Sequence, residues 1–274
     1  MSEFIKMELP LPFKAAQPYM ESIRKEIKKP KFELYAIMGI DEAVDLGILD
    51  KSLYLECRDR IERAWTGESI KAQGLKQTEL LEQTKCLRDL YDEGHEMALP
   101  LFERWKEGLS LGYEDASRKR KILRKKELDD LNARLGENLV ATTLYLGFPE
   151  FGKENLDLIA KEWAPYAKLA DNLSDMGEDI WRAGFINVPE EEIENLKGLE
   201  LEKNEVKKVN PVGLAIKRDY LLEKEKEVKR GFKRAEGLFM EINQRMGRVD
   251  KERSALFMNH NQSWLLEIKR AFKL

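Results

Sequence analysis

The chain has 274 residues, of which 42% are hydrophobic and 36% are charged, and its formal net charge is −3. The hydrophobic fraction can form a substantial core, and the near balance of charge argues against a dedicated nucleic-acid-binding protein, which usually carries a basic excess. The chain has only two cysteines, Cys57 and Cys86, and two histidines, which excludes a disulfide framework and a zinc site of clustered His and Cys.

The apolar stretches of the chain are too short to cross a membrane. The longest nearly apolar stretch, Leu139 to Phe148, has ten residues, whereas a membrane-spanning helix needs roughly 20. The N-terminal segment, Met1 to Pro12, lacks the apolar centre of a signal peptide. We therefore expect a cytoplasmic protein with no transmembrane segment, although its ligand can still be lipid-like.

Apolar residues recur every three or four positions along most of the chain, which is the pattern of amphipathic helices. A helix is expected after Pro30, and it leads into Asp41. Breaks between helices are expected at 66–67, 108–112 and 147–152, where glycines occur. Alternating β-branched runs are nearly absent, so the sequence predicts few strands.

The second half of the chain predicts longer helices. Leucines between Leu128 and Leu139 share one helical face, and another helix is expected over 156–173, with Pro165 kinking or restarting it. The acidic and then mixed-charge stretch 188–210 predicts a surface loop with a short helix. Residues 211–274 predict two or three long helices, so the whole chain is expected to form one all-α domain.

Two aspartates, Asp41 and Asp45, lie four residues apart in the sequence DEAVD. Residues at this spacing share one helical face, where like charges repel and cost some helix stability. Taken alone, such a pair is more often a solvated helical face than a binding site. A second acidic cluster changes that interpretation.

The second cluster places Asp171, Asp175 and Asp179 at successive four-residue intervals. The angular offset between successive members is about 40°, so all three face the same way along roughly 12 Å of helix. No lysine or arginine lies between the first and the last of them, and apolar Leu173 and Met176 flank the stripe. We therefore expect this acidic stripe to border buried surface.

Two carboxylate-rich stripes on different helices suit a hard divalent cation. Mg²⁺ prefers oxygen ligands and commonly joins a few carboxylates to the phosphates of a substrate. A cation in this position stabilises the negative charge of a departing diphosphate, so that the bond between the substrate carbon and the diphosphate oxygen can break. Ca²⁺ is less suited, because no EF-hand loop spacing occurs. The alternative is a polar helix pair that binds no ligand.

Both clusters lie in segments that resemble the squalene and phytoene synthases. Residues 32–45, FELYAIMGIDEAVD, resemble the first aspartate-rich segment of that family, and 169–179, LADNLSDMGED, resemble the second. The second segment matches in spacing, in the small residue before the first aspartate and in its final Gly-Glu-Asp. Residues 129–147 resemble the helix between the two segments, and the similarity covers roughly residues 30–274.

The resemblance implies a single-domain isoprenoid-synthase helical bundle over residues 1–274, around a central apolar cavity. The implied reaction is the Mg²⁺-dependent ionisation of allylic prenyl diphosphates, C15 or C20, followed by head-to-head condensation. The implied catalytic residues and magnesium ligands are Asp41, Asp45, Asp171, Asp175 and Asp179. The implied substrate-binding residues are Tyr35, Asn138 and Arg182.

Several positions depart from the family pattern. An arginine that usually precedes the first motif is replaced by the Met-Gly-Ile of 38–40, Asp130 falls near a usual tyrosine, and Leu139 replaces a glycine. Because these positions help to hold the second prenyl chain, we expect ionisation to be retained and conversion to squalene to be lost. The cavity walls are expected to include parts of 135–148 and parts of 169–176.

Two other interpretations stay open. One is ionisation without coupling, as in a terpene synthase or diphosphate lyase; the other is a non-catalytic lipid-binding scaffold, which intact aspartates at all five positions argue against. The basic run 118–126, RKRKILRKK, predicts either peripheral contact with an anionic membrane or a helix face balanced by acidic neighbours, which we favour. No GxGxxG or GxxxxGK[ST] motif occurs, so no nucleotide site of those types is expected.

Overall fold

The computed structural model describes residues 11–34, 36–37, 40–41, 44, 50–203, 205–210, 213–246 and 251–272. Most of these residues are helical, as the sequence predicts. The α-helices are α1 (Leu11–Glu26), α3 (Ser52–Trp65), α4 (Leu75–Asp92), α5 (Ala98–Ala116), α6 (Lys125–Gly147), α7 (Gly152–Glu178), α8 (Arg218–Met246) and α9 (Lys251–Phe272). Shorter helical segments are η1 (Pro149–Phe151), the π-helix η2 (Asp179–Ala183) and η3 (Glu190–Asn195).

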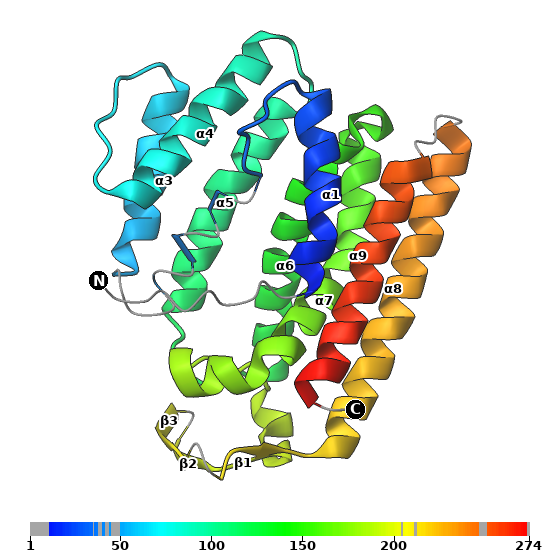
Figure 1. Cartoon of the computed structure of the whole chain (residues 1–274). Helices are drawn as coiled ribbons and strands as arrows, with labels where there is room; N and C mark the ends of the chain where they lie inside the picture. Colours follow the sequence, from blue (N-terminus) through cyan, green and yellow to red (C-terminus); the bar gives the residue numbers. More distant parts are fainter. Residues whose placement is uncertain are drawn as a thin grey trace.

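The helices α6 and α7 form the best-packed pair, and other helices are arranged around them. Helix α5 packs on α6, while α8 and α9 pack on α7, and α1 lies against α9 (Figure 1). Helices α3 and α4 cover α5 on the other side. The fully buried side chains include large aromatic groups from several of these helices, such as Trp105, Trp163, Tyr145 and Phe239.

The close approach of α6 to α7 depends on Gly136. A Cβ atom at this position would lie 2.4 Å from the backbone oxygen of Ala164, which is far closer than atoms in contact allow. A glycine therefore lets the two backbones approach where any side chain would push them apart. The same helix, α6, buries Leu128 and Leu131 in the core.

Helix α7 runs through Pro165 without a break, so of the two outcomes expected there, a kink or a restart, the restart does not occur. A proline inside a helix removes one backbone hydrogen bond and usually costs about 3 kcal/mol. The flanking Trp163 and Ala167 are both buried. We infer that tertiary packing of these side chains holds the helix through the proline.

The segment predicted as a loop with a short helix contains small β-sheets as well. Strands β1 (Leu196–Lys197) and β4 (Ala215–Ile216) form one antiparallel pair, with Leu196 opposite Ile216. Strands β2 (Leu199–Glu202) and β3 (Glu205–Val209) form a hairpin, with Leu199 opposite Val209. In Figure 1 these strands lie together at the lower end of the molecule.

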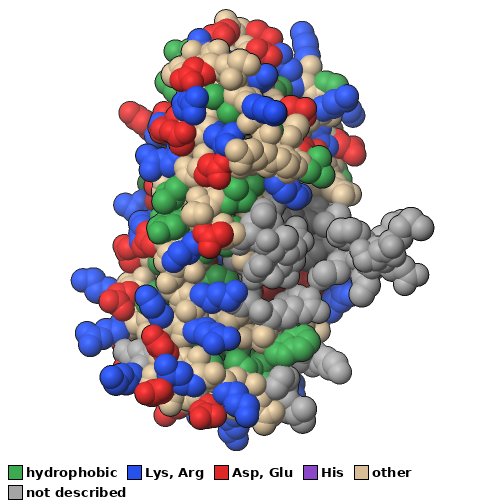
Figure 2. Space-filling view, turned by 90° about the vertical axis from the view of Figure 1, so that its left-hand side faces the viewer, with side chains coloured by type: hydrophobic (Ala, Val, Ile, Leu, Met, Phe, Trp, Pro, Cys, Tyr) green, Lys and Arg blue, Asp and Glu red, His purple; other side chains and the backbone are tan. Residues whose placement is uncertain are grey.

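The C-terminal region forms two long helices, α8 and α9, within the predicted range of two or three. Across the described residues, no helix combines the length and the apolar composition that a membrane-spanning segment requires. Figure 2 shows lysine, arginine and acidic side chains interspersed over one face of the molecule, in keeping with the near-balanced charge.

Candidate active site

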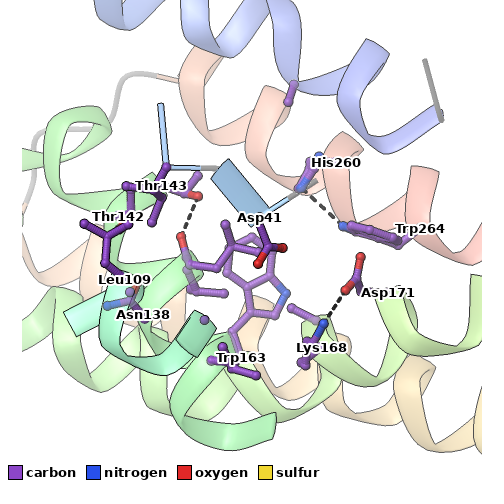
Figure 3. A pocket seen from close by; sticks show the side chains of 18 of the residues that line it. Asp41, Leu109, Asn138, Thr142, Thr143, Trp163, Lys168, Asp171, His260 and Trp264 are labelled. Carbon is purple, nitrogen blue, oxygen red and sulfur yellow. Dashed lines mark hydrogen bonds and ion pairs between the residues drawn. The ribbon is translucent and has the colours of Figure 1, made fainter. Parts of the chain in front are cut away.

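A cavity of about 160 Å³ lies between helices α1, α5, α6, α7 and α9, next to residues of the 36–41 segment and α3 (Figure 3). That volume is many times what one water molecule needs. Most of the lining is apolar. The apolar and aromatic lining residues are Ala16, Ile37, Tyr54, Gly108, Leu109, Gly112, Leu135, Leu139, Val140, Trp163, Ala167 and Trp264, and the polar ones are Asp41, Asn138, Thr142, Thr143, Lys168, Asp171 and His260.

Asp41 is the predicted first-motif aspartate that the structure places at this cavity. The hydroxyl of Tyr54, on α3, donates a short hydrogen bond to the Oδ1 of Asp41. Although Asp41 has accessible surface, enough protein surrounds the carboxyl that burial raises its pKa, an effect that the Tyr54 hydrogen bond partly offsets. In Figure 3, Asp41 lies between the α6 side chains and those of α7 and α9.

Asp171 lines the same cavity and is paired with a cation that the sequence interpretation did not include. The Nζ of Lys168 lies 2.7 Å from the Oδ2 of Asp171, and the two side chains are 20% and 29% exposed. Burial of Lys168 disfavours its charge, but the charges of Asp171, Asp115 and Asp179, with the hydrogen bond to Asp171, together raise its pKa. The i, i+3 spacing of Lys168 and Asp171 was the signal that could have revealed this pair.

The other two aspartates of the second motif continue from Asp171 towards the end of α7 and do not belong to the cavity lining given above. Asp175 is exposed, and Asp179 is the first residue of the π-helix η2. Burial raises the pKa of Asp179 to about 7, and the charges of Asp171 and Asp175 add to this effect, while Lys168 opposes it. The three carboxyls therefore share one electrostatic environment, as the four-residue spacing predicts.

A buried arginine anchors Asp179. Arg118 is 5% exposed, its Nε lies 2.5 Å from Asp115, and its guanidinium donates to the Oδ1 of Asn187 at 2.7 Å. Asn187 in turn donates to the Oδ2 of Asp179 at 2.7 Å. The sequence placed Arg118 in a basic run that either contacts a membrane or is balanced by acidic neighbours. Arg118 does pair with the acidic neighbour Asp115, but it is buried, so this residue does not face a membrane. The exposed Arg124 and Lys125 do lie near acidic partners, as the favoured interpretation expects.

Asn138, a predicted substrate-binding residue, lines the cavity and is held by α5. Its Nδ2 donates to the backbone oxygen of Arg104 at 2.6 Å. A Cβ atom on Gly108 would lie 2.8 Å from the Oδ1 of Asn138, so the absence of a side chain on α5 makes room for this amide. Because its nitrogen is engaged, Asn138 would contact a ligand through its oxygen.

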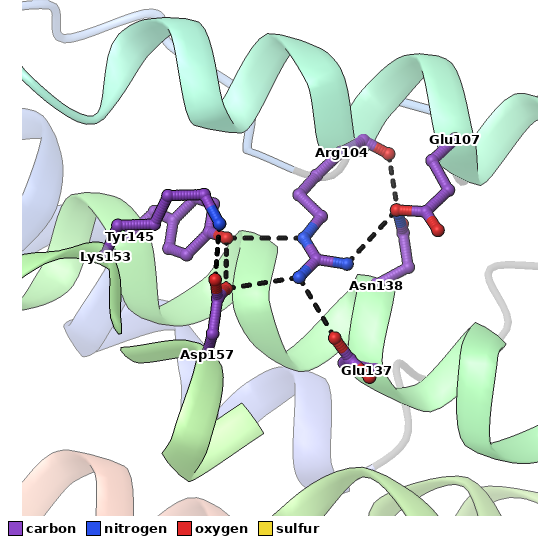
Figure 4. Close-up of polar contacts among 7 residues, drawn as sticks. All are labelled: Arg104, Glu107, Glu137, Asn138, Tyr145, Lys153 and Asp157. Atoms are coloured by element: carbon purple, nitrogen blue, oxygen red, sulfur yellow. Dashed lines mark hydrogen bonds and ion pairs between the residues drawn. The ribbon is translucent and has the colours of Figure 1, made fainter. Parts of the chain in front are cut away.

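Arg104 is the centre of a polar network between α5, α6 and α7 (Figure 4). Its guanidinium donates to Glu137 at 3.1 Å and to Asp157 at 3.2 Å, and it also contacts Glu107 at 3.1 Å. The hydroxyl of Tyr145 donates to Asp157 at 2.5 Å. Glu137 and the neighbouring Asn138 thus belong to a polar cluster that joins the helices beside the cavity.

Aromatic side chains from α7 and α9 close another part of the cavity. The indole Nε1 of Trp264 donates to the Nε2 of His260 at 3.3 Å, and the rings of Trp163 and His260 meet edge to face at 6.4 Å between centroids. Neither His260 nor Trp163 was predicted from the sequence to be a site residue. Only the long-range packing of α9 against α7 brings them together.

Several predictions fall elsewhere. Tyr35 and Asp45 lie outside the described residues, and so does the side chain of Arg182, although its backbone belongs to η2. Asp130 is exposed and pairs with Arg134 at 3.0 Å, so it does not place an extra carboxylate in the cavity.

Parts of both segments that were expected to form the cavity walls do line the cavity. Side chains from the first half of 135–148 line the cavity, including Leu139, which replaces the glycine of the family pattern. From 169–176 the lining includes Asp171, whereas Leu173 and Met176 are buried in the core cluster. The apolar flanks of the acidic stripe therefore stabilise α7 and do not form cavity wall.

The side chains at this site fit magnesium by their chemistry. Within the described part of the chain, no group of three or more His, Cys, Asp or Glu side chains is arranged to hold a metal ion. Mg²⁺, however, keeps several waters and often takes one or two carboxylates together with substrate phosphates. Asp41 and Asp171 bring two carboxylates to one cavity, and these are the side chains that would hold the ion.

Comparison with known proteins gives no match: neither a protein-family model, nor a curated protein, nor a solved structure resembles this chain significantly.

Proposed function

We propose that this protein is a magnesium-dependent enzyme that ionises allylic prenyl diphosphates. One observation carries the proposal: Asp41 and Asp171, which are 130 residues apart in the chain, line the same largely apolar cavity together with Lys168. The resemblance of both aspartate segments to squalene and phytoene synthases supports the same conclusion. We further propose that the helices form a single isoprenoid-synthase-type domain, and that the enzyme acts in the cytoplasm.

In this proposal each group at the cavity has a separate role. Bound Mg²⁺ would neutralise charge on the departing diphosphate. Lys168 would leave its partner Asp171 and donate to a phosphate oxygen, while Tyr54 keeps the carboxylate of Asp41 oriented. The rings of Trp163 and Trp264 would stabilise positive charge on the prenyl chain, and the apolar walls would limit its access to water.

Ionisation without coupling is the outcome that the cavity favours over head-to-head condensation. Coupling requires two prenyl diphosphates in one site, one ionised and one held as acceptor. Leu139 occupies wall where the family has glycine, and Trp163 lines the same cavity. Adding bulk to a packed path usually costs about 1–3 kcal/mol. The expected products are therefore diphosphate with a prenyl alcohol or a cyclised hydrocarbon, whereas a cyclopropyl diphosphate would show that coupling occurs.

The test is to incubate the full chain with C10, C15 and C20 allylic diphosphates and Mg²⁺, and to measure diphosphate release and products by mass spectrometry. The variants Asp171→Asn and Asp41→Asn should lose at least about 100-fold in release, as expected when a group that stabilises leaving-group charge is removed. Asp89→Asn, an exposed aspartate on α4, serves as the matched control and should keep full activity.

Each outcome separates the candidate functions. Squalene formed from farnesyl diphosphate in the presence of NADPH would show that coupling is retained. No diphosphate release from any substrate, with tight binding of prenyl chains, would favour the lipid-binding scaffold. Equal release by wild type and Asp171→Asn would show that the assigned site is wrong.

A further inference from the structure

Three segments meet at the lower end of the molecule in Figure 1 and form one surface, which we call the hairpin corner. It comprises residues 119–121, the π-helix η2 with Gly184, and the β2–β3 hairpin. The amide of Arg120 donates to the backbone oxygen of Gly184 at 2.7 Å, and the amide of Val206 donates to that of Arg120 at 2.9 Å. Backbone hydrogen bonds thus fix the three segments relative to one another.

Two large apolar side chains of this corner are exposed. Trp181 in η2 is 55% exposed and Leu201 in β2 is 41% exposed. The other four tryptophans of the chain are buried, at Trp105, Trp163 and Trp264, or half-buried, at Trp65. Tryptophan is highly buried on average, and an accessible indole is typical of interfaces where one side is apolar and the other wet.

The charge around these side chains is positive. Residues 119–121 and 199–209 contain six lysines and arginines against three glutamates, and all nine of these charged residues are exposed. Lys207 pairs with Glu202 and Glu205. For Lys119, Arg120 and Lys121 the structure gives no ion pair among the described residues. An accessible cationic cluster therefore belongs to the same corner as exposed Trp181 and Leu201.

We propose that the hairpin corner binds the surface of an anionic lipid bilayer, with Trp181 and Leu201 at the headgroup level and Lys119, Arg120 and Lys121 contacting anionic headgroups. Indole side chains are enriched at membrane–water interfaces. Clustered lysines and arginines are attracted to anionic leaflets. An anionic bilayer matches this combination, because exposed Trp181 and Leu201 supply the apolar contact and the exposed cations of the same corner supply the attraction to headgroups. The proposal is independent of catalysis, since it concerns a surface outside the cavity.

The test measures binding of the full chain to vesicles at low ionic strength. One set of vesicles contains only phosphatidylcholine, which is neutral, and the other also contains the anionic lipid phosphatidylglycerol. We expect partitioning into the anionic vesicles and little into the neutral ones. The triple variant Lys119→Gln, Arg120→Gln, Lys121→Gln should partition about 100-fold more weakly. The matched control replaces Lys226, Lys229 and Lys233, which are exposed on α8, by glutamine and should partition like wild type.

A fluorescence measurement makes the assignment specific. Brominated lipid in the vesicles should quench the emission of Trp181 in the wild type, whereas the emission of Trp181→Phe, whose remaining tryptophans are buried or half-buried, should barely change. Absence of binding to anionic vesicles would overturn the proposal and leave the corner as a protein-binding surface. Equal losses in the two triple variants, or binding without bromine quenching, would also overturn it.

Discussion

Replacing Asp179 by asparagine should stabilise the protein at alkaline pH. Burial raises the pKa of this carboxyl from 3.8 to about 7. Between these two values the folded protein holds a proton that the unfolded chain has released, so stability falls as pH rises, and the full penalty is present above pH 7. Below about pH 4 both states are protonated and the penalty vanishes. Asparagine keeps an oxygen that can accept the hydrogen bond from Asn187 and removes the charge.

The size of the effect follows from the pKa shift. A shift of about three pH units corresponds to about 4 kcal/mol, at 1.36 kcal/mol per unit. Because Asp179 keeps some accessible surface, solvent reduces this penalty, and we expect Asp179→Asn to gain on the order of 2 kcal/mol at pH 8. That gain corresponds to a rise in Tm of about 4–8 °C for a chain of this size.

The assay is urea unfolding of wild type and Asp179→Asn at pH 5 and pH 8, in buffer with EDTA so that bound metal does not contribute. The difference between the two proteins should be largest at pH 8 and should fall to less than half of that value near pH 5, because pH 5 lies about one unit above 3.8 in an interval of about three units. A variant less stable than wild type at pH 8 would refute the reasoning, because it would show that the ionised carboxylate is well compensated in the folded state.

Three further predictions concern the contacts around the site. Lys168→Gln should lower the free energy of unfolding by about 1–2 kcal/mol at pH 8, since the carboxylates around it lose their cation. The control Lys153→Gln removes an exposed ion pair and should cost less than about 1 kcal/mol. Equal losses for the two variants in urea unfolding would contradict this prediction. Arg118→Met should cost about 3–5 kcal/mol because it leaves buried acceptors unpaired, and a loss under about 1 kcal/mol would show that the network does not stabilise the fold. Gly136→Ala should lower the free energy of unfolding by more than about 2 kcal/mol, because the new methyl group overlaps the backbone of α7. The control Gly177→Ala places its methyl group where no atom lies within 4 Å, and it should raise the free energy of unfolding by up to about 1 kcal/mol through helix propensity. Equal melting temperatures of the two variants would contradict the close packing of α6 and α7.

The spacing of apolar residues predicted the helical architecture well. Apolar residues at every third or fourth position indicate both that a segment is helical and which of its faces is buried. Leu128 and Leu131 are in the core, and Leu135 and Leu139 of the same stripe line the cavity. The sequence could not separate these two roles, since a core wall and a cavity wall are equally apolar. It also did not predict the β2–β3 hairpin, although the Leu-Glu-Leu-Glu alternation of β2 is a short strand signal.

For the candidate site, spacing along the chain predicted which aspartates share a helix face but not which partners they have. The ion-pair partner of Asp171 is Lys168. Lys168 lies three residues before the stretch 171–179, within which the sequence has no lysine or arginine. Arg118 looked like part of an exposed basic run, yet it is buried because Asp115 and Asn187 satisfy its guanidinium. Such pairings depend on burial and on contacts between distant segments, which a local pattern does not report.

The central claim is that Asp41 and Asp171 hold one ligand between them, and a crystal structure of the complex with Mg²⁺ and farnesyl thiolodiphosphate, which resists ionisation, tests it most directly. The account predicts Mg²⁺ bound by carboxylate oxygens of Asp41 and Asp171 together with the diphosphate, Lys168 turned to a phosphate oxygen, and the prenyl chain in the cavity that Leu139 and Trp163 line. A diphosphate bound elsewhere, or a cavity that stays without the prenyl chain while the ion pair of Lys168 and Asp171 persists, would contradict it.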